Sequence, residues 1–309
     1  MYGARTLPWP AGWPGEALRL VAFGLLFLAL AALLSPLWWA LPVPRDGIGP
    51  YAATAVTAAA ALAAGWLLLR VADGRSAGAL GTAVSGQAMR QAGVGMGVGL
   101  AGLTTAVVGI GAVGSLTYSA APGTTTGWLT TVALHGGVFT VAALAEEALF
   151  RGYPFQVLAR WAGPVVATAV TSVLFAAAHG MNPEVGVLAL LNIFLAGVLL
   201  AVAYLRTLSL WFATAVHMAW NWAMATLFDL PVSGIAAFDT PLYDASVGGP
   251  QWWTGGGFGP EGGLVGSLGF GVALLLVLRL RVVAPDTTIV AAGPLVLDRT
   301  RGVAQRMRG

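Results

Sequence analysis

Eight long apolar runs divide the chain and constrain its fold more than any other feature. They cover residues 19–42, 51–72, 92–115, 127–150, 163–181, 185–206, 208–228 and 262–281. A helix needs about 20 apolar residues to cross a hydrocarbon core of about 30 Å. Because lipid offers no hydrogen bonds to a backbone, spanning segments are helices or closed barrels. The runs predict an all-α polytopic membrane bundle of about eight transmembrane helices.

The composition supports one membrane domain over residues 1–309, with no soluble domain attached. Hydrophobic residues make up 58% of the chain and charged residues only 9%, whereas about a quarter of a typical soluble domain is charged. The sequence has no cysteine, which excludes disulfides, thiolate metal sites and a cysteine nucleophile. It also excludes a prenyl or palmitoyl anchor on this chain.

The basic residues predict the orientation of the bundle. All 15 are arginines, and if the N-terminus is cytoplasmic, every one except Arg45 falls on the cytoplasmic side. The positive-inside rule then predicts both termini in the cytoplasm and an integral protein of the cell membrane. The excess of arginine over acidic residues is therefore explained by the orientation of the protein in the membrane. No nucleic acid partner is expected. We expect residues 282–309 to be a loosely ordered cytoplasmic tail. The sequence contains no indication of the oligomeric state.

Three glycine-rich or proline-rich segments have simple interpretations. The stretch "LPWPAGWPGE", residues 7–16, resembles an interfacial anchor. Residues 231–263 form the longest hydrophilic connection and are expected to be an outer loop. "GVGMGVGLAG", residues 93–102, is predicted to be a helix-packing face, because no strand precedes it and the chain has no lysine for a phosphate loop.

Charged residues interrupt the apolar pattern in "VAALAEEALFRGYPFQ", residues 141–156. A charge in the middle of a bilayer costs roughly 2.5–3.5 kcal/mol on insertion scales, so such residues usually face a partner or a cavity. Glu147 and Arg151 are four residues apart and can pair on one helix face. The alternative is that Glu146, Glu147 and Arg151 simply meet water at the cytoplasmic end of the fourth span.

Two of the three histidines lie in apolar helices beside a second residue at helical spacing. "FAAAH" pairs Phe175 with His179, and "HMAWN" pairs His217 with Asn221. Polar groups in three different spans need partners that lipid cannot supply, which favours one common polar cavity. We interpret His135, in "VALHGGVF", as structural or supporting.

Carboxylates, imidazoles and an amide are the groups that a peptide hydrolase requires. A carboxylate beside an imidazole can deprotonate a water molecule, and a second imidazole and an amide can stabilise an oxyanion. Ser172 and Thr214 lie near the histidines in sequence, but nothing activates them, and neither GxSxG nor HExxH is present. Zinc held by Glu146, His179 and His217 remains open, because two histidines and a glutamate form a catalytic zinc set.

The ordered motifs "EEALFR", "FAAAH" and "HMAWN" resemble the EExxxR, FxxxH and HxxxN pattern of the CAAX prenyl protease and bacteriocin-processing (CPBP, or Abi) intramembrane proteases. The resemblance covers about residues 127–228, which would form the catalytic core. It implies Glu146 and His179 as the water-activating pair, with His217 and Asn221 as the oxyanion site. The supporting motif positions are Glu147, Arg151 and Phe175. The family is described with and without a catalytic metal, and we favour the metal-free glutamate mechanism.

The resemblance implies an endopeptidase that takes a peptide or membrane-protein substrate from the bilayer, and no motif identifies a prenyl group. One alternative is a proton-coupled transporter with a relay of Glu146, His179 and His217. Another is a catalytically inactive immunity or scaffold protein. The intact motifs disfavour the inactive protein, and the absence of a recognisable inverted repeat disfavours transport.

Simple up-and-down spans conflict with this site. They separate Glu146 and His179 by about 15 Å in depth, at about 1.5 Å per helical residue. We therefore predict that the fourth helix continues past Arg151 toward Arg160, with a kink at Pro154.

Overall fold

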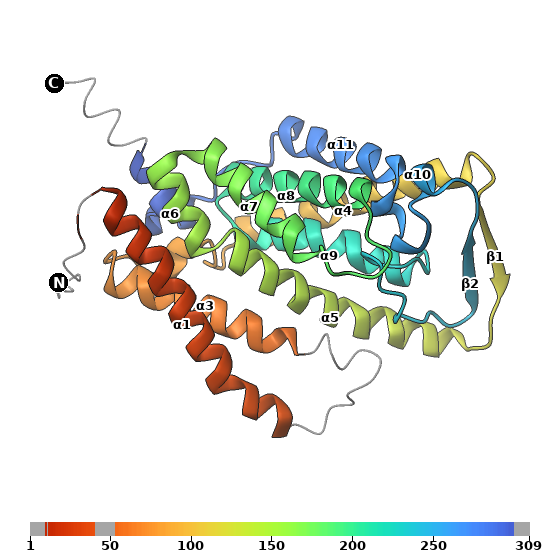
Figure 1. Ribbon diagram of the computed structural model, residues 1–309, viewed down its shortest axis with the longest axis horizontal. Helices are drawn as coiled ribbons and strands as arrows, with labels where there is room; N and C mark the ends of the chain where they lie inside the picture. Colours follow the sequence, from red (N-terminus) through yellow and green to blue (C-terminus); the bar gives the residue numbers. More distant parts are fainter. Residues whose placement is uncertain (1–9, 11, 41–52, 300–309) are drawn as a thin grey trace.

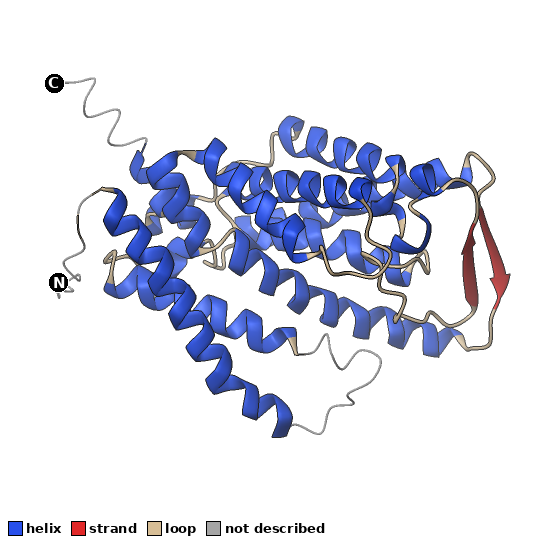
Figure 2. Cartoon of the chain, in the orientation of Figure 1, coloured by secondary structure: helices blue, strands red, loops and turns tan. Residues whose placement is uncertain are grey.

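The computed structural model describes residues 10, 12–40 and 53–299, and it is mostly helical (Figures 1 and 2). Each apolar run contains one helix, and these are α1 (Trp13–Ala40), α3 (Thr54–Val71), α4 (Gly86–Gly111), α5 (Thr125–Phe150), α7 (Pro164–Ala178), α8 (Val187–Thr207), α9 (Leu210–Thr226) and α11 (Leu264–Arg279). The predicted all-α class is confirmed.

Among the described residues, five helical segments are long and apolar enough to cross a membrane: residues 13–38, 54–71, 86–111, 125–162 and 187–207. Two further apolar helices, α7 and α11, are shorter. The predicted number of crossings and their orientation stay predictions.

The glycine-rich stretch of α4 is a packing face, as the sequence predicts. A Cβ atom on Gly99 would overlap the carbonyl oxygen of Val216, and one on Gly95 would lie 2.8 Å from the carbonyl oxygen of Phe212. Only glycine permits this approach to α9, the helix that carries His217 and Asn221. The packing of α4 therefore fixes the position of the HMAWN motif.

The chain breaks where a continuous helix was predicted. Helix α5 ends at Phe150, and a separate helix α6 (Tyr153–Ala162) follows after a turn at Arg151 and Gly152. A Cβ atom at residue 152 would overlap the carbonyl oxygen of Ala148, so the turn requires glycine. Pro154 lies in the first turn of α6, a position that proline tolerates. The predicted kink at Pro154 is wrong, although the chain does continue helically toward Arg160.

The long loop after α9 is ordered and contains a strand, which the sequence analysis did not predict. Strand β1 (Leu116–Ala120) pairs antiparallel with β2 (Tyr243–Val247), with Leu116 opposite Val247. Figure 2 shows this pair beyond the end of the helices. The loop also forms three short helices, α10 (Gln251–Thr254), η2 (Gly256–Phe258) and η3 (Pro260–Gly262).

The segment after α11 packs on the bundle through residue 299, so the predicted loose tail is wrong there. It forms α12 (Thr287–Ala292) and η4 (Leu295–Leu297), near η1 (Ala77–Leu80) and α6. Asp286 accepts hydrogen bonds from two backbone amides of α12 and from the Ser85 hydroxyl. Gln156 of α6 accepts a hydrogen bond from the Leu295 amide at 2.8 Å. Residues 300–309, and residues 7–9 and 11 of the predicted anchor at residues 7–16, lie outside the described residues.

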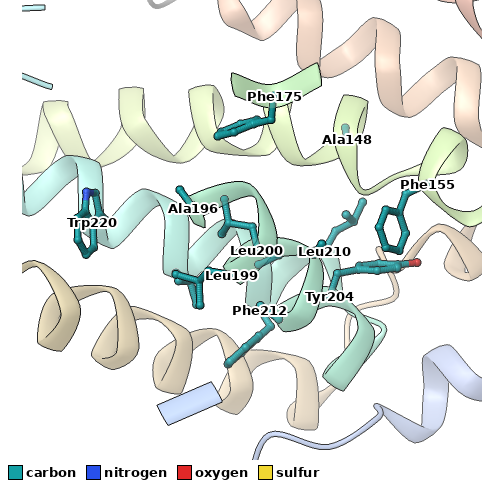
Figure 3. Close-up of a cluster of buried hydrophobic side chains, with 14 of the residues drawn as sticks. Ala148, Phe155, Phe175, Ala196, Leu199, Leu200, Tyr204, Leu210, Phe212 and Trp220 are labelled. Atoms are coloured by element: carbon teal, nitrogen blue, oxygen red, sulfur yellow. The ribbon is translucent and has the colours of Figure 1, made fainter. Parts of the chain in front are cut away.

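Helices α7, α8 and α9 supply the apolar core beside the predicted site. Figure 3 shows Phe175 of α7, Leu199 and Leu200 of α8, and Trp220 of α9 within one buried cluster. The exposed fractions of Phe175 and Trp220 are 2% and 3%, similar to those of Leu199 and Leu200. The polar residues of the motifs therefore sit against a rigid apolar wall.

Candidate active site

Glu147 and Arg151 form a fully buried ion pair at the end of α5. Both side chains are 0% exposed, and the Arg151 Nη1 atom donates to Glu147 Oε1 at 3.1 Å. Arg151 Nη2 also donates to the carbonyl oxygen of Gly197 in α8 at 2.9 Å. The guanidinium carbon lies 4.6 Å from the centre of the Phe175 ring. The predicted pairing is confirmed, and exposure to water at the end of a span does not describe these two residues.

His217 lies between the two adjacent carboxylates of α5. Its Nδ1 is 3.0 Å from Glu147 Oε1, and its Nε2 is 3.8 Å from Glu146 Oε2. An ionised carboxylate only accepts hydrogen bonds, so Nδ1 carries the proton in the bond to Glu147. The second ring nitrogen, Nε2, is therefore the one directed toward Glu146.

The tautomer of His179 is assigned from its backbone contact. His179 follows the last residue of α7, and its Nδ1 lies 2.8 Å from the carbonyl oxygen of Phe175. A carbonyl only accepts, so Nδ1 donates, and in the neutral ring Nε2 keeps its lone pair. This nitrogen is free to take a proton.

Two adjoining cavities bring the predicted residues together. The larger has a volume of about 400 Å³ and is lined by Glu146, His179 and Asn221, with Phe139, Phe150 and Phe238 among its apolar walls. The smaller, of about 30 Å³, is lined by His179, His217 and Asn221 and has room for a water molecule. His179 and Asn221 line both cavities. The polar groups of three helices thus converge on one place.

Glu146 differs from Glu147 in its surroundings, although the two are neighbours in sequence. Its side chain is 36% exposed. Its Oε2 atom is nevertheless buried and has no hydrogen-bond partner among the described residues. The 3.8 Å separation from His217 Nε2 is longer than a direct hydrogen bond, and a water molecule can bridge groups at such separations.

Glu261 and Ser233 are parts of the site that the motif analysis missed. Both line the smaller cavity, Ser233 also lines the larger one, and the Ser233 hydroxyl donates to Glu261 Oε2 at 2.6 Å. Ser233 has a left-handed backbone with φ of 49°, and its carbonyl oxygen accepts from Asn182 Nδ2. Both come from the loop after α9. The only sequence signal is an acidic residue, Glu261, directly before the last apolar run at residues 262–281.

The other polar residues considered from sequence lie outside the cavities. His135 Nδ1 is 3.0 Å from the Thr226 hydroxyl, and its ring packs edge-on against Phe238, which fits the structural or supporting role predicted for it. The hydroxyls of Ser172 and Thr214 are buried and have no hydrogen-bond partner among the described residues. Neither therefore has a base in contact that would activate it as a nucleophile.

The donor set does not fit a metal ion well. Within residues 10, 12–40 and 53–299, no group of three or more histidine and acidic side chains is arranged to hold a metal. Both ring nitrogens of His217 face carboxylates of one helix. The zinc set considered from sequence, Glu146, His179 and His217, is therefore not arranged as a metal site within these residues.

Comparison with known families identifies the segment that carries these residues. Residues 127–223 match the model of the Rce1-like family, described as type II CAAX prenyl endopeptidase Rce1-like. The matched segment contains all three motifs, and the match confirms the resemblance to the CPBP family. No curated protein matches the chain. The family match and the apolar helices point to an integral membrane protein.

Proposed function

Because residues 127–223 match the model of the Rce1-like CAAX endopeptidases, we propose that the protein is an intramembrane endopeptidase that uses an activated water molecule. The observation that supports this most strongly is the convergence of Glu146, His179 and Asn221 on one cavity, with His217 beside them. These residues come from α5, α7 and α9, and isolated burial of each would be unfavourable.

Glu146 and His179 act as the pair that activates water. The carboxylate of Glu146 accepts a proton from water, and the lone pair on His179 Nε2 offers a second acceptor across the cavity. The resulting hydroxide attacks the carbonyl carbon of the scissile peptide bond. A positioned base of this kind contributes roughly 10²–10⁴ in rate.

Asn221 and His217 stabilise the oxyanion that this attack creates. The Asn221 amide donates one hydrogen bond. His217 already uses Nδ1–H toward Glu147, so it donates from Nε2 only as an imidazolium. The carboxylates of Glu146 and Glu147 on either side of the ring favour that cation.

Arg151 and Phe175 hold these groups in place. Arg151 neutralises Glu147 and fixes it to α8 through the carbonyl oxygen of Gly197. The ring of Phe175 lies 4.8 Å from the His179 ring and 5.9 Å from the His217 ring, between centroids. This arrangement limits the rotation of both imidazoles.

The substrate is a peptide or membrane protein that reaches the site from the bilayer. The larger cavity has apolar walls, including Phe139, Phe150 and Phe238, and these suit an apolar residue next to the cleaved bond. We place the protein in the cell membrane with both termini cytoplasmic, following the distribution of arginines.

Cleavage by the purified protein tests the proposal. The protein in detergent is incubated with a farnesylated peptide that ends in a CAAX sequence and with the same peptide lacking the farnesyl group. Mass spectrometry then identifies new carboxyl termini. We expect cleavage by the wild type and none by Glu146→Gln. Proton flux across liposomes without cleavage of either peptide would contradict the proposal and favour a transporter.

A further inference from the structure

A third carboxyl group, that of Glu261, lines the smaller cavity together with the two histidines. Glu261 is 3% exposed and lines the smaller cavity together with His179, His217 and Asn221. It lies in η3, outside the three motifs and outside the matched segment. Neither water activation nor oxyanion stabilisation, as proposed above, involves its side chain.

Packing of the loop does not require this carboxyl group. Asn192 of α8 donates to the backbone carbonyl oxygens of Glu261 and Gly263, both at 2.8 Å. Asn192 is held in turn by the Ser267 hydroxyl at 2.6 Å. The loop is thus anchored through its backbone, whereas burying an acidic side chain is unfavourable. A catalytic role therefore explains the buried carboxyl group of Glu261 better than a role in folding the loop.

Ser233 connects Glu261 with the larger cavity. Its hydroxyl is 2.6 Å from Glu261 Oε2, and Ser233 lines both cavities. Its left-handed backbone is unusual for a residue other than glycine, and Asn182 holds its carbonyl oxygen at 2.9 Å. Backbone strain of this type clusters at functional sites. The strained turn directs the hydroxyl to the boundary between the two cavities.

We propose that Ser233 and Glu261 form a proton relay that protonates the leaving amine, an inference that rests on the proposed peptidase function. When the carbon–nitrogen bond breaks, its electron pair stays on the nitrogen, which takes a proton from Ser233 Oγ. In the same step Ser233 Oγ accepts the proton of Glu261. The protonated Glu261 acts as the donor here, so the Ser233 hydroxyl turns its hydrogen away from Glu261 Oε2 and toward the amine. The proton that Glu146 removed from water restores Glu261 after the amine leaves.

The environments of the two carboxyl groups suit these different roles. Burial raises the pKa of Glu261, and the hydrogen bond from Ser233 only partly opposes this effect. Glu261 therefore keeps its proton to higher pH than an exposed glutamate. Glu146 is partly exposed and faces an imidazole. Contrasting environments of this kind divide two carboxyl groups into an acid and a base.

A change of leaving group tests the relay. An amine leaves only when it is protonated, whereas p-nitrophenolate leaves without a proton. The cleaved peptide is therefore compared with the p-nitrophenyl ester of the same acyl segment. We expect Glu261→Gln and Ser233→Ala to slow peptide hydrolysis by about 10²-fold or more, the contribution of a positioned acid. Both variants should hydrolyse the ester at the wild-type rate.

The exposed carboxylate of Glu184, on a neighbouring loop, provides the matched control Glu184→Gln, which should cleave both substrates normally. Equal losses on peptide and ester in Glu261→Gln and in Ser233→Ala would overturn the relay, and so would full peptide activity in both. A wild-type protein that cleaves neither substrate would overturn the proposed function together with the relay.

Discussion

Two groups of ion pairs in this protein have similar chemistry but different charge balance. At one end, Arg19, Arg75 and Arg160 face Glu16, Asp73 and Asp298, so three permanent cations meet three carboxylates. This group joins α1, α6, the end of α3 and the C-terminal segment (Figure 1). Its charges cancel without the help of a titrating group.

The group at the candidate site contains two carboxylates, Glu146 and Glu147, and one permanent cation, Arg151. Only a protonated His217 restores the balance. A network with equal numbers of permanent cations and carboxylates stabilises the fold. A network with one extra carboxylate needs a proton on His217 for neutrality, and that proton can move.

The largest expected effect is on kcat, and it should differ between the adjacent residues Glu146 and Glu147. Glu146→Gln should lower kcat by about 10²–10⁴-fold, because the amide cannot take a proton from water. Thermal stability should stay at the wild-type value, since Glu146 is partly exposed. Glu147→Gln should reduce kcat less and stability more, because it leaves Arg151 buried without a full counter-charge. Similar kcat values for both variants, close to wild type, would contradict the assignment of the base.

Removal of the buried cation should mainly affect stability. Arg151→Met should lower the free energy of unfolding by about 3–5 kcal/mol, because Glu147 is then a buried charge without a partner. Thermal unfolding in detergent measures the loss. Adding Glu147→Gln to this variant should recover part of the stability. If the double variant is less stable than Arg151→Met alone, the uncompensated charge is not the cause.

A somewhat smaller effect is expected at the oxyanion site. Asn221→Ala should lower kcat by roughly 10²–10³-fold with little change in KM, because the donor acts on charge that develops in the transition state. Strong chelators should leave the wild-type rate unchanged. Stoichiometric zinc in active protein, lost together with activity in His217→Ala, would instead establish a metal mechanism.

The smallest effect is expected in the balanced network. Arg160→Gln removes an ion pair to Glu16 of 2.6 Å, but Arg19 remains close to Glu16 and Asp73. We expect a loss of about 1 kcal/mol in the free energy of unfolding, near the upper range for incompletely buried pairs. Peptide cleavage should be unchanged. A loss of activity at wild-type stability would show that this end of the bundle takes part in chemistry.

The positions of the helices, and the pairing of motif residues on one helix face, could be predicted because both depend on residues close together in the sequence. Apolar length locates a spanning helix, and a spacing of four places His217 with Asn221 on one face of α9. The proximity of Glu146 and His179 was expected because burying either polar side chain alone is costly. Simple up-and-down spans had instead predicted a separation of about 15 Å in depth. The break at Gly152 was missed because it depends on contact with the Ala148 carbonyl oxygen.

The contribution of Glu261 and Ser233 could not be predicted in the same way. Their positions depend on pairing between Leu116 and Val247, on Asn192 in another helix, and on a left-handed turn at Ser233. None of these has a signature in a few neighbouring residues. The docking of residues 282–299 likewise depends on distant partners, such as Gln156 for Leu295.

The pairing of β1 with β2 has a consequence for biosynthesis. When the ribosome has added Asn221, all three motifs have been translated, but the partner strand of β1 and the wall that carries Glu261 have not. A nascent chain at that stage therefore has its motif side chains in an unfinished enclosure. Enclosure of the two cavities waits for the final third of translation, so a prematurely terminated product would carry every motif and still lack the wall that Ser233 and Glu261 provide.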